Sequence, residues 1–236
     1  MFTKLSDTNK ATTMMESQGR FKVSISRVRM FLALLAIVGI AGYLLNLAAL
    51  HFLRTDVNPV VEPVSNYAVG TYGFLSTAAN IGSGLAALAL TVGLYLGIAP
   101  PGRSRVGLFL LGLFGVCELL AAIFPIDVGA QATMNGTIHN IVGNISFFGF
   151  LAAVILLSWS MGKDEQWRSI RRPALALALV VTGMAALTIV GANIGIGFGV
   201  GQRLFNVTSM GWMLLVALRI RSMARGSLPG QSSRVR

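Results

Sequence analysis

Long apolar runs alternate with short polar segments along the chain, and this pattern predicts six membrane-spanning helices. The apolar runs reach about 20 residues, the length at which an α-helix crosses roughly 30 Å of hydrocarbon. We expect the helices at residues 30–53, 72–99, 106–124, 137–161, 173–195 and 204–220. Pro173 is expected to open the fifth helix, because proline is favoured at the first helical position. Glycines at alternate positions from Gly195 to Gly201 predict a tight turn before the sixth.

The predicted fold is therefore all-α, a polytopic transmembrane bundle of six helices within residues 30–221. Residues 1–29 and 222–236 are polar and basic. We expect both to be tails, and the first to be disordered, because such a segment offers little apolar surface to bury.

Composition and charge agree with a membrane protein. The chain has 236 residues, of which 54% are hydrophobic and 11% charged. A soluble domain carries about 25% charged residues. The net charge of +11 does not indicate nucleic-acid binding, because 17 of the 19 basic residues fall on one side of the predicted bundle. By the positive-inside rule, that side is cytoplasmic and so are both termini.

Polar residues inside the apolar runs gather toward the opposite, outer ends of the helices. Ser76, Asn80 and Ser83 are spaced to share one helical face, as are Asn140 and Asn144. Glu118 lies in the third run, Thr188 and Asn193 in the fifth, and Asn206 and Ser209 in the sixth. Since polar groups in a membrane face the bundle interior or a wet cavity, we predict one outward-facing polar pocket. Hydrogen bonding between helices, with no ligand, is the alternative.

Several residues at the outer side are candidates for binding a ligand. Arg54 and Arg203 are the two basic residues outside the cytoplasmic side, and arginine suits phosphate or carboxylate groups. Asp127 could pair with either arginine. We therefore expect the pocket to take a lipid headgroup or a small anionic ligand. The predicted ligand-binding residues are His51, Arg54, Tyr67, Asn80, Asn140, Asn144, Asn193, Arg203 and Asn206.

Two motifs in the outer loops carry a resemblance to a known family. One is Asn58-Pro59 followed by Pro63-x-Ser65-x-Tyr67-Ala68-x-Gly70, and the other is Phe124-Pro125-x-Asp127 followed by His139. With Arg203, they resemble the bacterial and archaeal membrane family catalogued as domain of unknown function 998. The likeness spans residues 28–219. It implies a multi-pass protein of a prokaryotic plasma membrane and carries no established activity.

The sequence leaves the function open between several classes. Ser65, His139 and Asp127 are the residue types of a nucleophile, a base and an orienting acid, and Glu118 could also act as an acid or base, so a lipid hydrolase at the outer leaflet is one alternative. A transporter coupled to protons through Glu118 is another. His51 and His139 could ligate haem or, with a carboxylate, zinc; no paired-histidine motif supports a metal site, and no cofactor is assigned. Small residues from Gly82 to Ala87 permit close helix contact within the chain or between copies.

Overall fold

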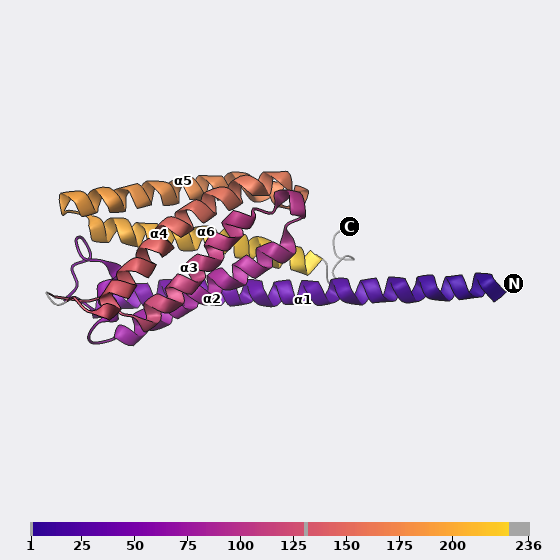
Figure 1. Cartoon of the computed structure of the whole chain (residues 1–236). Helices are drawn as coiled ribbons and strands as arrows, with labels where there is room; N and C mark the ends of the chain where they lie inside the picture. Colours follow the sequence, from indigo (N-terminus) through magenta and orange to yellow (C-terminus); the bar gives the residue numbers. More distant parts are fainter. Residues whose placement is uncertain (1, 130–131, 227–236) are drawn as a thin grey trace.

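The computed structural model describes residues 2–129 and 132–226, with side chains from Val23 onward. It is an all-α bundle of six long helices joined by loops, three of which contain one 3₁₀ helix each (Figure 1). The elements are α1 (Phe2–Leu53), η1 (Val64–Ala68), α2 (Gly73–Gly97), η2 (Pro100–Gly102), α3 (Arg105–Ile123), α4 (Met134–Ser160), η3 (Met161–Lys163), α5 (Glu165–Ile194) and α6 (Phe198–Gly226).

The first five helices are long and apolar enough to cross a membrane. Within the described residues these spans are Val23–Leu53, Gly73–Gly97, Arg105–Ile123, Met134–Lys163 and Glu165–Ile194. The chain is thus a multi-pass membrane protein, as predicted. Helix α6 is not among the five, because polar and basic residues such as Arg203, Asn206 and Arg219 lower its hydropathy.

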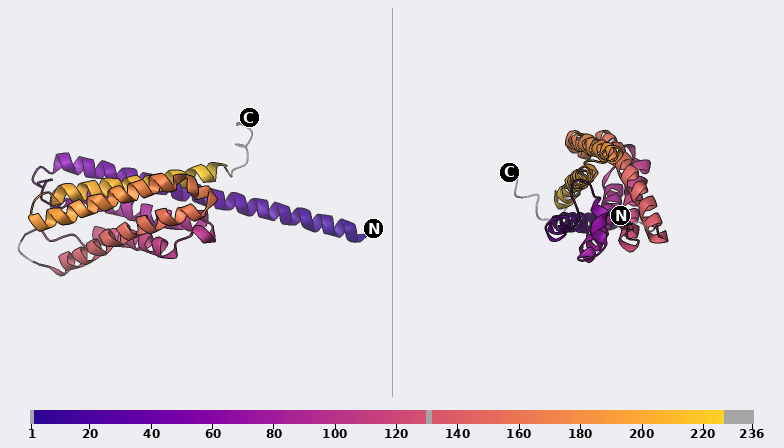
Figure 2. Two further views of the ribbon diagram at one scale, coloured as in Figure 1. Left: turned by 90° about the horizontal axis from the view of Figure 1, so that it is seen from above. Right: turned by 90° about the vertical axis from the view of Figure 1, so that its left-hand side faces the viewer.

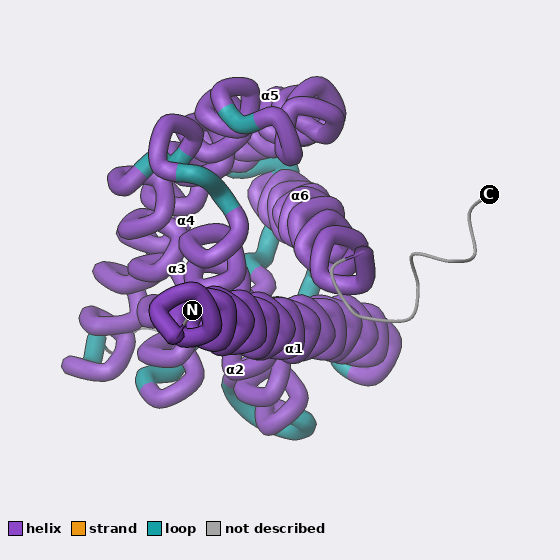
Figure 3. The backbone as a smooth tube through the Cα atoms, turned by 90° about the vertical axis from the view of Figure 1, so that its right-hand side faces the viewer, coloured by secondary structure: helices purple, strands orange, loops and turns teal. Residues whose placement is uncertain are grey.

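Each helix packs against the one before it in the chain, and α6 closes the bundle against α1 and α5. In the end-on view of Figure 3, α6 lies between those two helices. Helix α1 continues well beyond the bundle at its N-terminal end (Figures 1 and 2). The loops at residues 54–72 and 195–197 and the described loop residues 124–129 and 132–133 lie together at the other end, which we call the loop end.

Three helices begin more than three residues away from their predicted starts. Helix α1 begins at Phe2 rather than at residue 30, and residues 2–29 contain no proline that would stop the helix; the expected disorder of the tail stays a prediction. Helix α5 begins at Glu165, with Pro173 inside it, because the Asp164 side chain accepts a hydrogen bond from the Gln166 amide and supplies an earlier N-cap. The glycine turn is shorter than expected, since α6 starts at Phe198. Residues 227–236 lie outside the described part.

Glycines allow the first three helices to touch backbone to backbone. A Cβ atom on Gly39 of α1 would overlap the carbonyl oxygen of Gly82 in α2. Between α2 and α3, a Cβ on Gly84 would lie 2.8 Å from the Gly115 oxygen, and one on Gly115 would lie 2.9 Å from the Gly84 oxygen. The small residues of α2 therefore serve contacts within the chain. Close approach of this kind maximises van der Waals contact where lipid provides no hydrophobic driving force.

The half of the bundle away from the loop end is filled by large apolar side chains. Leu90, Leu111, Phe150, Leu157 and Trp212 are all fully buried there. At that end, Asp164 accepts a hydrogen bond from the Ala99 amide (2.7 Å), and the indole of Trp167 donates to the Gly97 carbonyl (3.0 Å). These bonds fix the start of α5 against the end of α2.

We predict that Gly39→Ala destabilises the protein while Gly42→Ala does not. Both glycines lie in α1, and a Cβ at Gly42 meets nothing within 4 Å. Both substitutions gain the same helix propensity, so their difference isolates the overlap with Gly82. Overpacking of this kind costs about 1–3 kcal/mol. Thermal unfolding in detergent measures the difference, and equal melting temperatures for the two variants would refute the close α1–α2 contact.

Candidate functional site

Arg54 organises the loop of residues 54–72 from within. Its side chain is buried and forms a two-pronged ion pair with Asp56, with both N–O distances at 2.8 Å. It also donates to the carbonyl oxygens of Val69 (2.8 Å) and Thr71 (3.0 Å). The hydrogen bond from Arg54 lowers the pKa of the Asp56 carboxyl. Arg54 thus donates its hydrogen bonds to groups of the loop rather than to a ligand.

Arg203, at the start of α6, joins the same loop from the other side. Its Nη1 donates to the carbonyl oxygens of Pro59 (3.1 Å) and Glu62 (2.9 Å), and its Nη2 to the Tyr67 hydroxyl (3.0 Å). Tyr67 is fully buried, and the guanidinium carbon lies 5.3 Å from its ring centroid. A cation with several fixed partners ties the loop to α6.

Asp127 holds the start of α4. Its carboxylate accepts from the Thr133 amide (2.7 Å) and hydroxyl (2.6 Å), and the Thr133 hydroxyl accepts from the Gly136 amide (3.2 Å). These two bonds from Thr133 lower the pKa of Asp127. A Cβ on Gly136 would overlap the carboxylate, so a larger residue there would displace Asp127 from these bonds. The pairing of Asp127 with an arginine, which we considered from the sequence, is absent from the described contacts.

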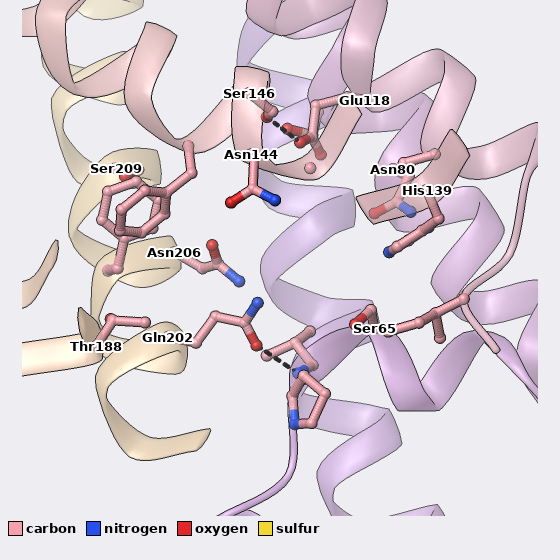
Figure 4. A pocket seen from close by; sticks show the side chains of 18 of the residues that line it. Ser65, Asn80, Glu118, His139, Asn144, Ser146, Thr188, Gln202, Asn206 and Ser209 are labelled. Atoms are coloured by element: carbon pink, nitrogen blue, oxygen red, sulfur yellow. Dashed lines mark hydrogen bonds between the residues drawn. The ribbon is translucent and has the colours of Figure 1, made fainter. Parts of the chain in front are cut away.

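A cavity of about 520 Å³ lies inside the bundle toward the loop end, and all six helices contribute to it (Figure 4). Its hydrogen-bonding lining residues are Tyr43, Ser65, Ser76, Asn80, Ser83, Glu118, His139, Asn140, Asn144, Ser146, Thr188, Asn193, Gln202, Asn206 and Ser209. Among the described residues that line the cavity, none is lysine or arginine. Pro63, Val64 and Ser65 of the loop cover its end, where the Gln202 side chain accepts from the Val64 amide (2.6 Å).

Glu118 lies at the end of the cavity away from the loop (Figure 4). Its carboxyl accepts a hydrogen bond from the Ser146 hydroxyl at 2.9 Å. The Ser83 hydroxyl also interacts with this carboxyl, although no hydrogen bond of standard geometry joins the two groups. Ser83 and Ser209 are 0% and 2% exposed, and neither hydroxyl makes a hydrogen bond of standard geometry to the described residues. Two buried hydroxyls without such bonds leave hydrogen bonds for a bound molecule to complete.

His139 faces the cavity with its ring orientation fixed (Figure 4). Its Nδ1 lies 2.9 Å from the Phe124 carbonyl oxygen. A carbonyl only accepts hydrogen bonds, so Nδ1 carries the proton and Nε2 remains for a bound molecule.

The structure separates the residues predicted for the site into two groups. Ser65, Asn80, Glu118, His139, Asn140, Asn144, Asn193 and Asn206 line the cavity. Arg54, Tyr67, Asp127 and Arg203 instead stabilise the loops. His51 is exposed, its ring edge-on to Phe52, and does not join His139 in the cavity. The described residues contain no cluster of three His, Cys, Asp or Glu arranged to hold a metal ion.

Three polar lining residues were not predicted. Gln202 shares a helical face with Asn206 and Ser209, with the same spacing as Ser76, Asn80 and Ser83 in α2. This spacing could have predicted Gln202 as a lining residue. Ser146 is likewise two turns from His139. Tyr43 sits in an apolar run without a polar neighbour pattern, and no feature of the sequence singles it out.

Comparison with known proteins identifies the family. The family model described as "Protein of unknown function (DUF998)" matches residues 28–219. The chain belongs to this family. No curated protein and no solved structure matches it.

The DUF998 match covers every residue that lines the cavity and the whole of the loop at residues 54–72. It leaves out the N-terminal extension of α1 and the end of α6. The protein is therefore an integral, multi-pass membrane protein whose family model contains the complete cavity.

We predict that Arg203→Lys loosens the loop at residues 54–72. Lysine has no planar fork and cannot reach two carbonyls and the Tyr67 hydroxyl together. The loss of a charged hydrogen bond costs about 1.5–3 kcal/mol. We expect a lower melting temperature and faster proteolysis within the loop. Arg105→Lys is the control, since Arg105 is exposed at the start of α3. Unchanged proteolysis in Arg203→Lys would contradict the assigned role.

We predict a pH-dependent effect for Asp127→Asn. The pKa of Asp127 is below its usual value of 3.8 in the folded protein, so protonation favours the unfolded chain. The ionised Asp127 carboxyl therefore stabilises the folded protein fully at pH values above its usual pKa of 3.8. This stabilisation is lost as the pH falls through the lower pKa that Asp127 has in the folded protein. The variant should therefore melt below the wild type at about pH 7, and the gap should narrow toward about pH 3. Melting curves over this range provide the check, and a gap that is constant with pH would show that the carboxylate plays no such part.

Proposed function

We propose that this DUF998 protein binds the polar headgroup of a membrane lipid in the cavity, which the lipid enters sideways between α4 and α5. The single observation that carries the proposal is a hydrogen-bonding cavity covered at its loop end and lined on one side by exposed residues of these two helices. We place the protein in a prokaryotic plasma membrane, with α6 as a sixth span and both termini in the cytoplasm.

The opening follows from the course of the two helices. They are joined through η3 and diverge toward the loop end (Figures 1 and 2). Asn140, Asn144 and Phe148 of α4 and Ile189 and Asn193 of α5 are both exposed and part of the cavity lining. Because α4 and α5 are membrane-spanning by length and composition, the gap between them faces lipid.

The covered end favours a lipid over a ligand from water. The loop at residues 54–72 lies across the cavity and is held by Arg54 and Arg203. Both arginines are occupied in this way and absent from the lining, so the small anionic ligand expected from the sequence has no cationic partner there. A cavity of this size is within the usual range of roughly 300–1,000 Å³ for small-molecule sites.

Transport receives less support than binding. The cavity reaches Glu118, and beyond it the bundle is filled by buried apolar side chains such as Leu111 and Phe150. The buried Ser158 hydroxyl in that half accepts a hydrogen bond from the Trp212 indole and is not part of the described cavity lining.

Hydrolysis of the bound lipid is a second candidate, favoured by one observation. Ser65 and His139 line the same cavity, and the Phe124 carbonyl orients the imidazole as an acid would in a catalytic triad. Asp127 does not take that position, because it is bound to Thr133.

We predict that Gly143→Phe prevents lipid binding. Gly143 lines the cavity on α4, and its side-chain direction is open space, so a phenyl ring there fills the cavity without disturbing the helix contacts. Gly149→Phe is the matched control, since it is also open but does not line the cavity. Native mass spectrometry should show at least about tenfold less retained lipid in Gly143→Phe, equivalent to about 1.4 kcal/mol.

Equal retention by both variants, or a wild-type protein without lipid, would refute the proposal. The same native mass spectra distinguish lipid binding from lipid hydrolysis, the second candidate function. Intact two-chain lipid supports binding, whereas a single-chain product that disappears in Ser65→Ala supports hydrolysis.

A further inference from the structure

Glu118 is an acidic group deep in the cavity without a basic partner. Its described neighbours are the hydroxyls of Ser146 and Ser83, with Tyr43 nearby. Besides Glu118, the titratable groups among the described lining residues are His139 and Tyr43. A carboxylate on a membrane helix is costly to insert, and an opposite charge offsets this cost.

The neighbouring polar atoms suit a ligand that donates hydrogen bonds. The carboxylate oxygens only accept, and the buried Ser83 hydroxyl beside them makes no hydrogen bond of standard geometry. An ammonium group offers three donors and no acceptor, so it can bond to the carboxylate and to the hydroxyl oxygens of Ser83 and Ser146. An anion at this place would be repelled by Glu118.

We propose that the cavity selects lipids whose headgroup carries an ammonium group, with Glu118 as its counter-ion. This inference rests on the proposed lipid binding and names the class of headgroup. In a phospholipid, the phosphodiester lies between the headgroup ammonium and the acyl chains. With the ammonium beside Glu118, the phosphodiester would lie toward the opening between α4 and α5, where Asn140 and Asn144 offer amide N–H groups.

The test compares two phospholipids that share the phosphodiester and the acyl chains. The protein is placed in nanodiscs of equal parts phosphatidylethanolamine and phosphatidylglycerol, and the lipid retained on release is identified by native mass spectrometry. We expect the wild type to enrich phosphatidylethanolamine roughly tenfold, which corresponds to about 1.4 kcal/mol. Glu118→Gln should retain lipid but lose the enrichment, because glutamine keeps the size and an acceptor oxygen but not the charge.

Glu165→Gln is the control, since Glu165 is exposed at the start of α5, at the opposite end of the bundle. It should keep the enrichment. Retention of both lipids without preference, or enrichment that survives in Glu118→Gln, would overturn the ammonium proposal and leave lipid binding intact. Absence of any retained lipid would overturn both. Displacement of the lipid by tail-less glycerophosphoethanolamine would support the same chemistry from a soluble source.

A second measurement needs no variant and remains available if Glu118→Gln does not fold. A hydrophobic carbodiimide modifies membrane-embedded carboxyls, and the modified peptide can be quantified by mass spectrometry after proteolysis. Labelling of Glu118 should fall at least about threefold in phosphatidylethanolamine relative to phosphatidylglycerol nanodiscs, since a bound ammonium covers the carboxyl. Equal labelling in the two lipids would overturn the proposal.

Discussion

The loop end of this protein depends on the requirement that a buried guanidinium find hydrogen-bond acceptors for its donors. Arg54 meets it with Asp56 and the carbonyl oxygens of Val69 and Thr71. The half-buried Arg203 meets it in part: its Nη1 and Nη2 donate to the carbonyls of Pro59 and Glu62 and to the Tyr67 hydroxyl, while its Nε has no partner among the described residues. An unpaired charge at either position would be costly. The loop at residues 54–72 therefore has one favoured course, and that course lies across the end of the cavity.

The loop at residues 54–72 determines from which side a ligand can enter the cavity. On most sides the helices are held close, through glycine contacts between α1, α2 and α3 and between α5 and α6, where a Cβ on Gly201 would lie 2.7 Å from Thr188. Helices α4 and α5 part toward the loop end (Figure 1). A cavity covered by a loop at one end and, as we propose, open at the side toward lipid is suited to an amphipathic ligand whose polar part enters and whose chains remain in the bilayer.

The sequence predicted the helices because their positions depend on spacing. Apolar runs set by membrane thickness gave the spans, and the polar residues that the sequence grouped on shared helical faces, among them Asn80, Asn140 and Asn144, line the cavity in the structure. It could not predict how the arginines are used. A guanidinium suits a phosphate and a set of backbone carbonyls equally well, and only the fold of the loop decides between them. The start of α5 was missed because the capping bond of Asp164 is a stronger signal than Pro173.

The most direct measurement of the central claim is an experimental structure of the full chain in nanodiscs made from its native lipid extract. Our account predicts elongated density that begins beside Glu118, passes Asn144 and leaves the bundle between α4 and α5. Density for water alone in the cavity, or α4 and α5 packed together along their whole length, would contradict it.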